Sequence, residues 1–273
     1  MRRRLVSLAL HAALVIGAAA TLVPLAWMVS ASVMPTGEAS MFPPRFLPTH
    51  TTLAHYRDLF DRLNLGRSFL NSALISISAT LFCLILTSLA GYAFARLRFA
   101  GRDRLFRSLL AGMVIPAQVA MLPLFLLLKA MGLVNTYWGV LIPYLAPIFG
   151  IFMVRQYALS VPQDYLDAAR VDGASELRIY WSVVLPLCRP ILVTLAVFVF
   201  MGTWNDFMWP LIELTDDRLY TLPVALANLS GEHAQDTEMM MAGSVLTVLP
   251  VLVLFLALQR YYIEGIMMGG VKE

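Results

Sequence analysis

The sequence predicts an all-α protein that crosses a membrane six times. Of its 273 residues, 59% are hydrophobic and only 14% are charged, and the mean hydropathy is +0.74. So few polar side chains could not cover the surface of a water-soluble globule of this length. Apolar runs long enough to cross about 30 Å of hydrocarbon, on the order of 20 residues each, lie at 5–33, 68–95, 105–129, 137–157, 191–214 and 242–262. We expect these runs to form one transmembrane domain over residues 1–273.

The first run imitates a cleavable secretion signal, because three arginines precede it and Ser30-Ala31-Ser32 follows it. A signal has an apolar core of about 7 to 15 residues, whereas this run is nearly twice as long and contains Pro24 and Trp27 near its far end. We therefore expect an uncleaved first transmembrane helix.

The positions of lysine and arginine predict the orientation, because positive residues close to the ends of spans are retained in the cytoplasm. With the N-terminus inside, most of the 20 basic residues fall on the cytoplasmic side. They are Arg2, Arg3, Arg4, Arg96, Arg98, Arg102, Arg104, Arg107, Arg155, Arg170, Arg178, Arg189, Arg260 and Lys272. Both termini are then expected in the cytoplasm. Membrane orientation also explains the net charge of +3, so no nucleic-acid partner is expected.

The remaining outer stretches, 34–67 and 215–241, are too short to bury a sizeable core of their own. The first is rich in proline and the second is acidic. Cys83 and Cys188 have no metal-site spacing, and their expected positions oppose a disulfide, so we expect both to serve packing.

Residues 160–190 form a polar interruption between the fourth and fifth runs. Ser160 and Gln163 have the S-x-x-Q spacing of a capping box, and Pro162 suits a first helical turn, so a helix is expected to begin here. Gly173 can adopt the left-handed conformation that ends it.

A second short helix is expected from Ser175, which can act as an N-cap, until Pro186 interrupts it. The pattern therefore predicts two helices joined by a glycine turn outside the bilayer. An ordinary helical loop would carry the same capping signals.

The polar segment contains Asp167-Ala168-Ala169, then Gly173, then Val183-Val184-Leu185-Pro186. In residue type and spacing this pattern resembles the EAA motif of ABC-importer permeases, with Asp for the usual Glu and Val for the usual Ile. Other segments are similar to the MalG-like carbohydrate-uptake branch, so the resemblance covers nearly the whole chain. These segments are Asn71-Ser72, Trp204-Asn205-Asp206-Phe207-Met208-Trp209-Pro210 and the closing run from Gln259-Arg260-Tyr261 to Gly270-Val271-Lys272. The departures at Asp167, Val183 and Glu273 are mild.

The resemblance implies a type I importer permease of MetI-like fold in the bacterial cytoplasmic (inner) membrane, moving a mono- or oligosaccharide by alternating access. It implies a second permease subunit, an ATPase dimer and an extracytoplasmic solute-binding protein as partners. The chain lacks a G-x-x-x-x-G-K-[ST] loop, so it is not expected to hydrolyse ATP itself, and ATP and Mg would be used by the partner ATPase. As a transport subunit it is not expected to be an enzyme, and we expect it to bind no cofactor or metal.

Coupling to that ATPase is expected through the polar segment, with Asp167 offering a carboxylate to a basic partner and Gly173 allowing the turn. The residues expected to take part are Asp167, Ala168, Ala169, Asp172, Gly173, Leu185 and Pro186. Leu185 and Pro186 would pass displacement to the fifth span.

A solute path is suggested by polar and aromatic groups at membrane depth. Sugars present apolar C–H faces and hydroxyl rims, which suit tryptophan beside amide and carboxylate acceptors. The candidates are Asn71, Ser72, Gln118, Trp204, Asn205, Asp206 and Trp209. Tryptophan belts and interhelical hydrogen bonds give the same pattern without any solute.

Several alternatives stay open at this point. An importer for glycerol phosphate, a polyol, an amino acid or a peptide would keep the cytoplasmic motif. A secondary transporter would require ion-coordinating acids near mid-membrane and inverted repeats with broken helices. A membrane enzyme would require paired acids, yet Asp206 and Glu213 stand seven residues apart on one run, too far to share a proton.

Overall fold

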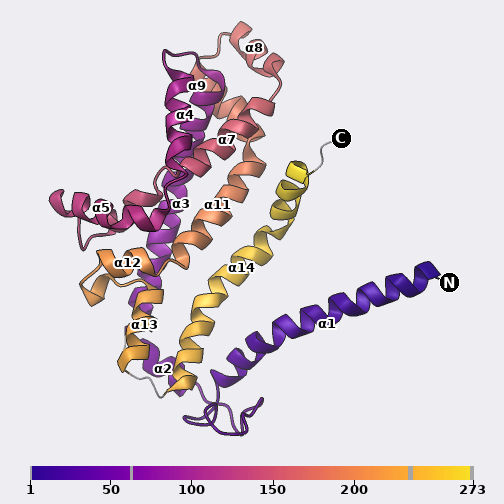
Figure 1. The fold of residues 1–273 in the computed structure, drawn as a ribbon, viewed down its shortest axis with the longest axis vertical. Coiled ribbons are helices and arrows are strands. Elements are labelled where there is room, and N and C mark those ends of the chain that lie inside the picture. The colour runs from indigo at the N-terminus through magenta and orange to yellow at the C-terminus, as the bar shows by residue number, and fades with distance from the viewer. Residues whose placement is uncertain (1, 62–63, 233–235, 271–273) are drawn as a thin grey trace. The chain divides into compact units, whose positions relative to one another are not determined.

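The computed structural model describes residues 2–61, 64–232 and 236–270, and in these ranges the only regular structure is helical (Figure 1). Glu273 and Lys272, which belong to the closing resemblance, lie outside the described residues. The chain divides into two compact units. Unit 1 comprises Met1–Arg67 and Leu222–Pro250, and unit 2 comprises Ser68–Thr221 and Val251–Glu273.

Unit 1 contains α1 (Arg2–Ala31), α2 (Ala54–Asp61), α13 (Leu222–Glu232) and the first part of α14 (Thr237–Gly270). A buried cluster of Ala31, Met34 and Ala39 closes the end of α1. The segment after α1 is held by His55, whose Nε2 lies 2.9 Å from the carbonyl oxygen of Met34.

Unit 2 contains most of α3 and the bent segments that follow it. Its helices are α3 (Leu65–Arg96), α4 (Arg102–Gly112), α5 (Ala117–Ala130), α6 (Tyr137–Leu141), η1 (Ile142–Tyr144), α7 (Ile148–Ser160), α8 (Gln163–Val171), α9 (Glu176–Ile179), η2 (Tyr180–Val184), α10 (Leu185–Leu187), α11 (Arg189–Trp204), α12 (Met208–Glu213) and η3 (Asp217–Leu219). Figure 1 shows α8 and α9 at one end of this unit and α12 towards the other.

Three described helices are long and apolar enough to span a membrane: Val6–Ala31, Leu65–Arg96 and Thr237–Ala257. Three further candidates are bent pairs, and counting each pair as one span would bring the total to six. The bends measure 104° between α4 and α5, 40° between Tyr137–Tyr144 and α7, and 76° between Glu176–Leu187 and α11.

The runs 105–129, 137–157 and 191–214 thus contain or adjoin breaks between helices. Pro116 and Pro147 stand as extended N-cap residues at two of the breaks. Proline has no N–H for the preceding turn and its ring clashes with it, so each helix restarts after the proline. The third run ends its first helix at Trp204, and α12 begins only at Met208.

Close packing of α3 on α7 organises the part of unit 2 that carries the polar segment. A Cβ atom placed on Gly91 would lie 2.7 Å from the Cβ of Val154, which real Cβ atoms do not tolerate. Glycine is therefore required for this contact. Cys83 packs with Val154 and Leu195 nearby, in the packing role expected for it.

Candidate functional site

The polar segment begins differently from the expected capping box. The Ser160 hydroxyl donates back to the carbonyl oxygen of Tyr157 at 2.7 Å and so belongs to the end of α7. Helix α8 starts at Gln163 after Pro162, without a side-chain cap. The Gln163 side chain is engaged elsewhere, because its Oε1 accepts from Arg96 at 2.8 Å and its Nε2 donates to Asp167 at 3.0 Å.

The glycine turn after α8 is confirmed. Gly173 has a φ of +78°, which favours glycine, and its N–H donates to the carbonyl of Arg170 at 3.0 Å. The N–H of Ala174 donates to the carbonyl of Ala169 at 3.0 Å. These two bonds form a Schellman motif, the common way to satisfy the last carbonyls of a helix.

The second helix begins as expected but does not end at Pro186. Ser175 caps it by accepting from the N–H of Arg178. Helix α9 then runs through the π-helical turn η2 into α10, where Pro186 occupies the first turn and costs no hydrogen bond. The chain bends at Cys188, just before Pro190, so the interruption lies a few residues later than expected.

Arg96, the last residue of α3, joins α3 to the start of the polar segment. Its guanidinium donates to the carbonyls of Ala158 at 3.0 and 2.7 Å, of Leu159 at 3.2 Å, and of Val161. The last carbonyls of a helix lack a following turn to bond them, so the guanidinium supplies donors there, and a cation at this end also complements the helix dipole. A fifth bond, to Gln163, extends the connection to α8.

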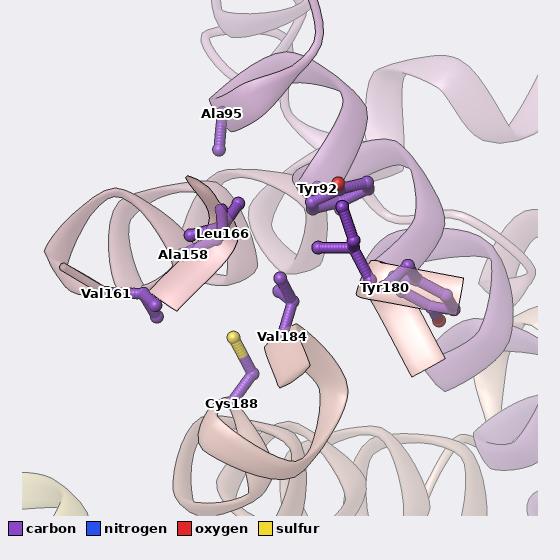
Figure 2. Close-up of a cluster of buried hydrophobic side chains, with 9 residues drawn as sticks. Tyr92, Ala95, Ala158, Val161, Leu166, Tyr180, Val184 and Cys188 are labelled. Atoms are coloured by element: carbon purple, nitrogen blue, oxygen red, sulfur yellow. The ribbon is translucent and has the colours of Figure 1, made fainter. Parts of the chain in front are cut away.

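A buried apolar cluster fixes the helix pair to α3 and α7. It gathers side chains from α3, α7, α8, α9 and η2, and Figure 2 shows them converging. The members are Tyr92, Ala95, Ala158, Val161, Leu166, Ile179, Tyr180, Val184 and Cys188. Leu166 is fully buried and anchors α8, and the Tyr180 hydroxyl lies 2.7 Å from that of Ser88. The pair is therefore packed against the helices as a rigid body rather than suspended as a loop.

Ion pairs on the outside of the cluster link the two short helices. Arg170 contacts Asp167 at 2.8 Å and Glu176 at 3.0 Å, and Glu176 also accepts from the Tyr92 hydroxyl at 2.5 Å. Hydrogen bonds from Gln163 and Arg170 hold the pKa of Asp167 below its ordinary value. The Asp167 carboxylate is thus charged and exposed, but one of its oxygens is already used within the chain.

The solvent side of the helix pair carries apolar side chains that the sequence reading did not single out. Val171 is 87% exposed, and Tyr165 and Leu177 are also exposed. Ala168 and Asp172 lie exposed on the same segment. The sequence offered one indication of this surface, because Val171 and Leu177 are apolar residues within an otherwise polar stretch. An exposed apolar group on an otherwise polar element is typical of a surface that another protein covers.

The two remaining coupling candidates, Leu185 and Pro186, lie where the pair joins α11. Leu185 packs against the buried cluster. Both residues also line an apolar cavity of about 470 Å³ between α3 and the segment from Tyr180 to Ala196. Both residues therefore lie between α9 and α11 along the chain, and their role in coupling stays a prediction.

Asn71 and Ser72 are both buried at the opposite end of unit 2. The Asn71 amide donates to the carbonyls of Arg218 and Tyr220, each at 3.0 Å, and its oxygen accepts from the Tyr137 hydroxyl at 2.7 Å. This amide ties α3 to the chain after α12. Its role toward a solute stays a prediction.

Trp204 and Trp209 are both almost fully buried. Trp204 stacks on Phe200 with ring centroids 5.7 Å apart and meets Phe69 edge-on at 5.4 Å. Trp209 donates from Nε1 to the carbonyl of Gly139 at 3.2 Å. One face of the Trp204 ring is thus covered by Phe200, and the Trp209 ring is enclosed in a buried apolar cluster.

Asp206 starts α12, because its Oδ1 accepts from the N–H groups of Met208 and Trp209, and its Oδ2 accepts from the Tyr144 hydroxyl. Tyr144 was not among the expected residues, and its distance of 62 positions along the chain hides the pairing. Asn205 is exposed beside this cap, with its Nδ2 bonded to the carbonyl of Met201. Gln118 is exposed on the first turn of α5.

Glu213, at the end of α12, is fully buried, and neither carboxyl oxygen has a hydrogen-bond partner in the described part of the chain. It packs directly on Gly139, where any side chain would collide with it. Among the described residues, no group of three or more His, Cys, Asp or Glu side chains could hold a metal ion.

Comparison with known proteins places these features in a family. Residues 84–266 match the model of the binding-protein-dependent transport system inner membrane component. The chain is 39% identical over 228 residues to an arabinooligosaccharides transport system permease protein, AraQ, of Halalkalibacterium halodurans, which covers 83% of this chain and 82% of the relative. It is 31% identical over 272 residues to the lactose transport system permease protein LacG of Rhizobium radiobacter, covering 100% and 98%.

Solved structures agree with the sequence relatives. A chain of a bacterial ABC transporter involved in the import of the acidic polysaccharide alginate matches with a TM-score of 0.84 and 25% identity, over 95% of this chain and 97% of that one. A chain of the MetNI methionine ABC transporter shares the fold, with a TM-score of 0.56 and 18% identity over 74% and 95%. The protein is therefore a multi-pass transport component rather than an enzyme, and it belongs to the family of binding-protein-dependent transport system inner membrane components, the permeases of ABC importers.

Proposed function

We propose that this chain is one of two permease subunits of a bacterial importer that moves a mono- or oligosaccharide inward by alternating access. The observation that carries the proposal is the helix pair α8 and α9, which is fixed to α3 and α7 yet exposes apolar side chains. Relatives named for arabinooligosaccharides and for lactose support a sugar as the solute.

In this proposal each bent helix pair crosses the inner membrane once, giving six spans with both termini in the cytoplasm. The arginine-rich ends of α3 and α4 and the polar segment then face the cytoplasm together, as the retention of positive residues there requires.

The coupling element consists of Asp167, Ala168, Ala169, Asp172 and Gly173. The small alanines allow close approach of an ATPase subunit, and exposed Val171 and Leu177 supply apolar contact. Charged groups at such a contact orient the partners more than they add affinity. Leu185 and Pro186 then transmit the movement of the pair to α11.

The solute path runs past the exposed residues Asn205 and Gln118. It also runs past Asp206, whose carboxylate accepts hydrogen bonds from the first N–H groups of α12. Four further residues of the proposed path are buried and hold the neighbouring helices in place: Asn71, Ser72, Trp204 and Trp209. Solute contacts by the buried four would require a second conformation, which alternating access provides.

The partners are a second permease subunit, an ATPase dimer that binds ATP and Mg²⁺, and an extracytoplasmic solute-binding protein. The acidic residues after α12 offer a polar surface for that binding protein. Surrounding lipid covers the exposed apolar faces of α1 and α3.

Co-purification and reconstitution test the proposal. The tagged chain, expressed with its neighbouring subunits, should bring down an ATPase dimer and a second permease. In liposomes, the cognate binding protein should stimulate ATP hydrolysis when loaded from a sugar panel. If ATP hydrolysis were stimulated only by binding protein loaded with an amino acid, a polyol or glycerol phosphate, the transported solute would belong to that class and not to the sugars. Transport without any ATPase would overturn the proposal.

A further inference from the structure

The loop formed by residues 41–47, within unit 1, turns large apolar side chains outward. Phe42 is 98% exposed and Leu47 is 77% exposed, and Met41 and Phe46 project in the same way. Four such side chains within seven residues form more exposed apolar surface than a water-facing loop normally carries.

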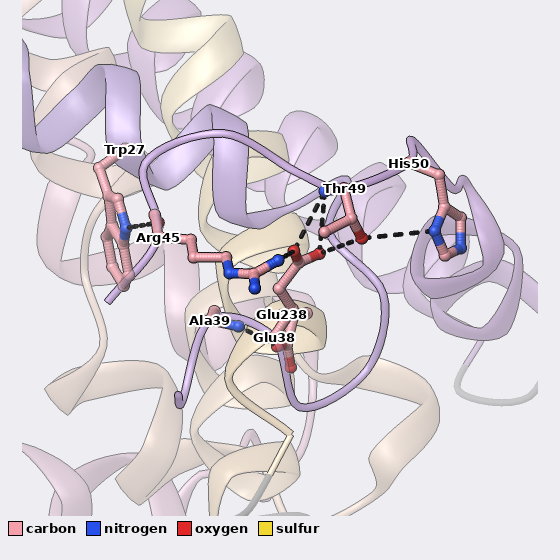
Figure 3. A network of polar contacts seen from close by, with 7 residues as sticks. All are labelled: Trp27, Glu38, Ala39, Arg45, Thr49, His50 and Glu238. Carbon is pink, nitrogen blue, oxygen red and sulfur yellow. Dashed lines mark hydrogen bonds and ion pairs between the residues drawn. The ribbon is translucent and has the colours of Figure 1, made fainter. Parts of the chain in front are cut away.

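Polar groups occupy the interior of the same loop. Glu38 is only 4% exposed, and its carboxylate accepts from the Thr49 N–H at 3.1 Å, from the Thr49 hydroxyl at 3.2 Å and from Arg45 at 3.3 Å. The N–H of Ala39 donates to Glu238 at 2.7 Å (Figure 3). The loop is therefore held by hydrogen bonds around the buried Glu38, while its large apolar side chains are exposed. Arg45, the one charged residue of 41–47, pairs with Glu38 and is itself 53% exposed. Several large apolar side chains exposed together on a hydrogen-bonded loop are the reverse of the arrangement that water favours.

Two hydrogen bonds set the depth of this loop against α1. The Trp27 indole donates to the carbonyl of Arg45 at 3.2 Å, and the Ser30 hydroxyl donates to the carbonyl of Phe46 at 2.6 Å. The apolar part of α1 runs for 26 residues, and at 1.5 Å per residue it extends about 39 Å. This exceeds the roughly 30 Å of hydrocarbon, so the last turns of α1 reach the membrane interface.

We propose that the 41–47 loop is a membrane anchor, with Met41, Phe42, Phe46 and Leu47 inserted at the boundary between lipid headgroups and acyl chains beside the end of α1. Trp27 at the same level is typical of that boundary. The ion pair with Glu38 balances the charge of Arg45, and the exposed arginine side chain can extend to the level of the lipid headgroups. A lipid surface fits better than a soluble protein because the loop is bonded to the end of a long apolar helix that is exposed from Arg4 to Ala26 among the described residues.

The anchor itself rests only on α1 crossing a membrane. Which leaflet it enters depends on the proposed orientation, and in that orientation it is the outer leaflet. The anchor would hold the proline-rich outer segment at a fixed height while the rest of the permease moves.

Spin-label accessibility tests the anchor. Phe42→Cys is made in a Cys83→Ser, Cys188→Ser background, and the full chain with its co-expressed subunits is labelled and placed in phosphatidylglycerol and phosphatidylethanolamine vesicles. At position 42 we expect the collision rate with oxygen, which concentrates in lipid, to exceed that with a water-soluble nickel chelate several-fold. Thr51→Cys, an exposed position after the network, is the matched control and should show the opposite order.

Leu47→Cys provides a second readout in case Phe42→Cys fails to assemble. A high nickel collision rate at positions 42 and 47 would show that the loop lies in water and would overturn the anchor. Low rates for both reagents would show that protein covers the loop, and would overturn it equally. None of these readouts depends on ATP hydrolysis or solute, so failure of the anchor is distinct from failure of the importer proposal.

Discussion

A single guanidinium, that of Arg96, makes many of the hydrogen bonds at the start of the polar segment. Arg96 ends α3, binds three carbonyls at the end of α7 and reaches Gln163 in α8. The sequence shows Arg96 only as one of several cytoplasmic arginines. Its role depends on the meeting of α3 and α7, which are more than fifty residues apart along the chain.

Replacing Arg96 tests this role. Arg96→Gln removes several hydrogen bonds from a charged donor, each contributing roughly 1.5–3 kcal/mol, and leaves the carbonyls of α7 to water. We expect a lower melting temperature of the purified protein and weaker retention of the ATPase subunits. Arg98→Gln changes an exposed arginine two residues away and should alter neither. Equal behaviour of the two variants would contradict the role of Arg96.

Asp167 is exposed, so its ion pair with Arg170 should add little to stability. Asp167→Asn is expected to leave the melting temperature unchanged but to weaken ATPase binding, because the charge offered to the partner is lost. Pull-down of the ATPase measures this effect. Asp164→Asn, on the exposed side of the same helix, is the control. Unchanged binding in Asp167→Asn would remove the carboxylate from the interface.

The pH dependence of this contact follows from the lowered pKa of Asp167. Stabilisation by a carboxylate of lowered pKa is present above its ordinary value and disappears only as the pH falls through the lowered value. ATPase binding should therefore not change through Asp167 between about pH 5 and pH 8. A loss of binding within that range that Asp167→Asn abolishes would contradict the assignment.

At the scale of the elements, the sequence best predicted the helix ends and turns that depend only on neighbouring residues. The glycine turn at Gly173 and the N-cap at Ser175 depend on the backbone conformation and hydrogen bonding of a few adjacent residues, and both are confirmed. The capping box at Ser160 was wrong because a distant arginine engages Gln163. The bends at Pro116 and Pro147 could be suspected, but their angles depend on packing between helices.

The stretches 34–67 and 215–241 likewise make contacts that the sequence could not predict. The acidic composition of 215–241 is visible in the sequence, whereas the buried pairing of Ala39 with Glu238 joins positions 199 residues apart. The pairing of Tyr144 with Asp206 likewise depends on contacts between helices. Such partners lie far apart along the chain, so their pairing could not be predicted from sequence spacing.

The glycine turn is the element whose change should separate assembly from coupling. Valine at position 173 would be forced into a left-handed conformation that costs about 1–2 kcal/mol even for residues without a branched Cβ. We expect Gly173→Val to reach the membrane and to hydrolyse ATP without solute uptake. Parallel assays of uptake and hydrolysis in liposomes measure this uncoupling.

Gly202→Ala is the matched control, because Gly202 lies in α11 with no atom near its missing Cβ and no unusual φ. It should transport normally. Normal coupling in Gly173→Val would show that the turn between α8 and α9 is not mechanically required.

At the scale of the whole molecule, three long helices and three bent pairs are candidate spans, and one polar segment interrupts their apolar character. The segment is packed to α3 and α7 on one side and exposes Val171 and Leu177 on the other. In the proposed importer, this segment lies on the cytoplasmic side and is moved by a separate ATPase.

Labelling of position 172 tests that claim most directly. Asp172→Cys, in the Cys83→Ser, Cys188→Ser background, places one thiol at the exposed end of α8. A membrane-impermeant maleimide should react with it in inside-out vesicles stripped of ATPase, should react less when the ATPase is bound, and should not react in intact cells. Reaction from outside intact cells would contradict the account.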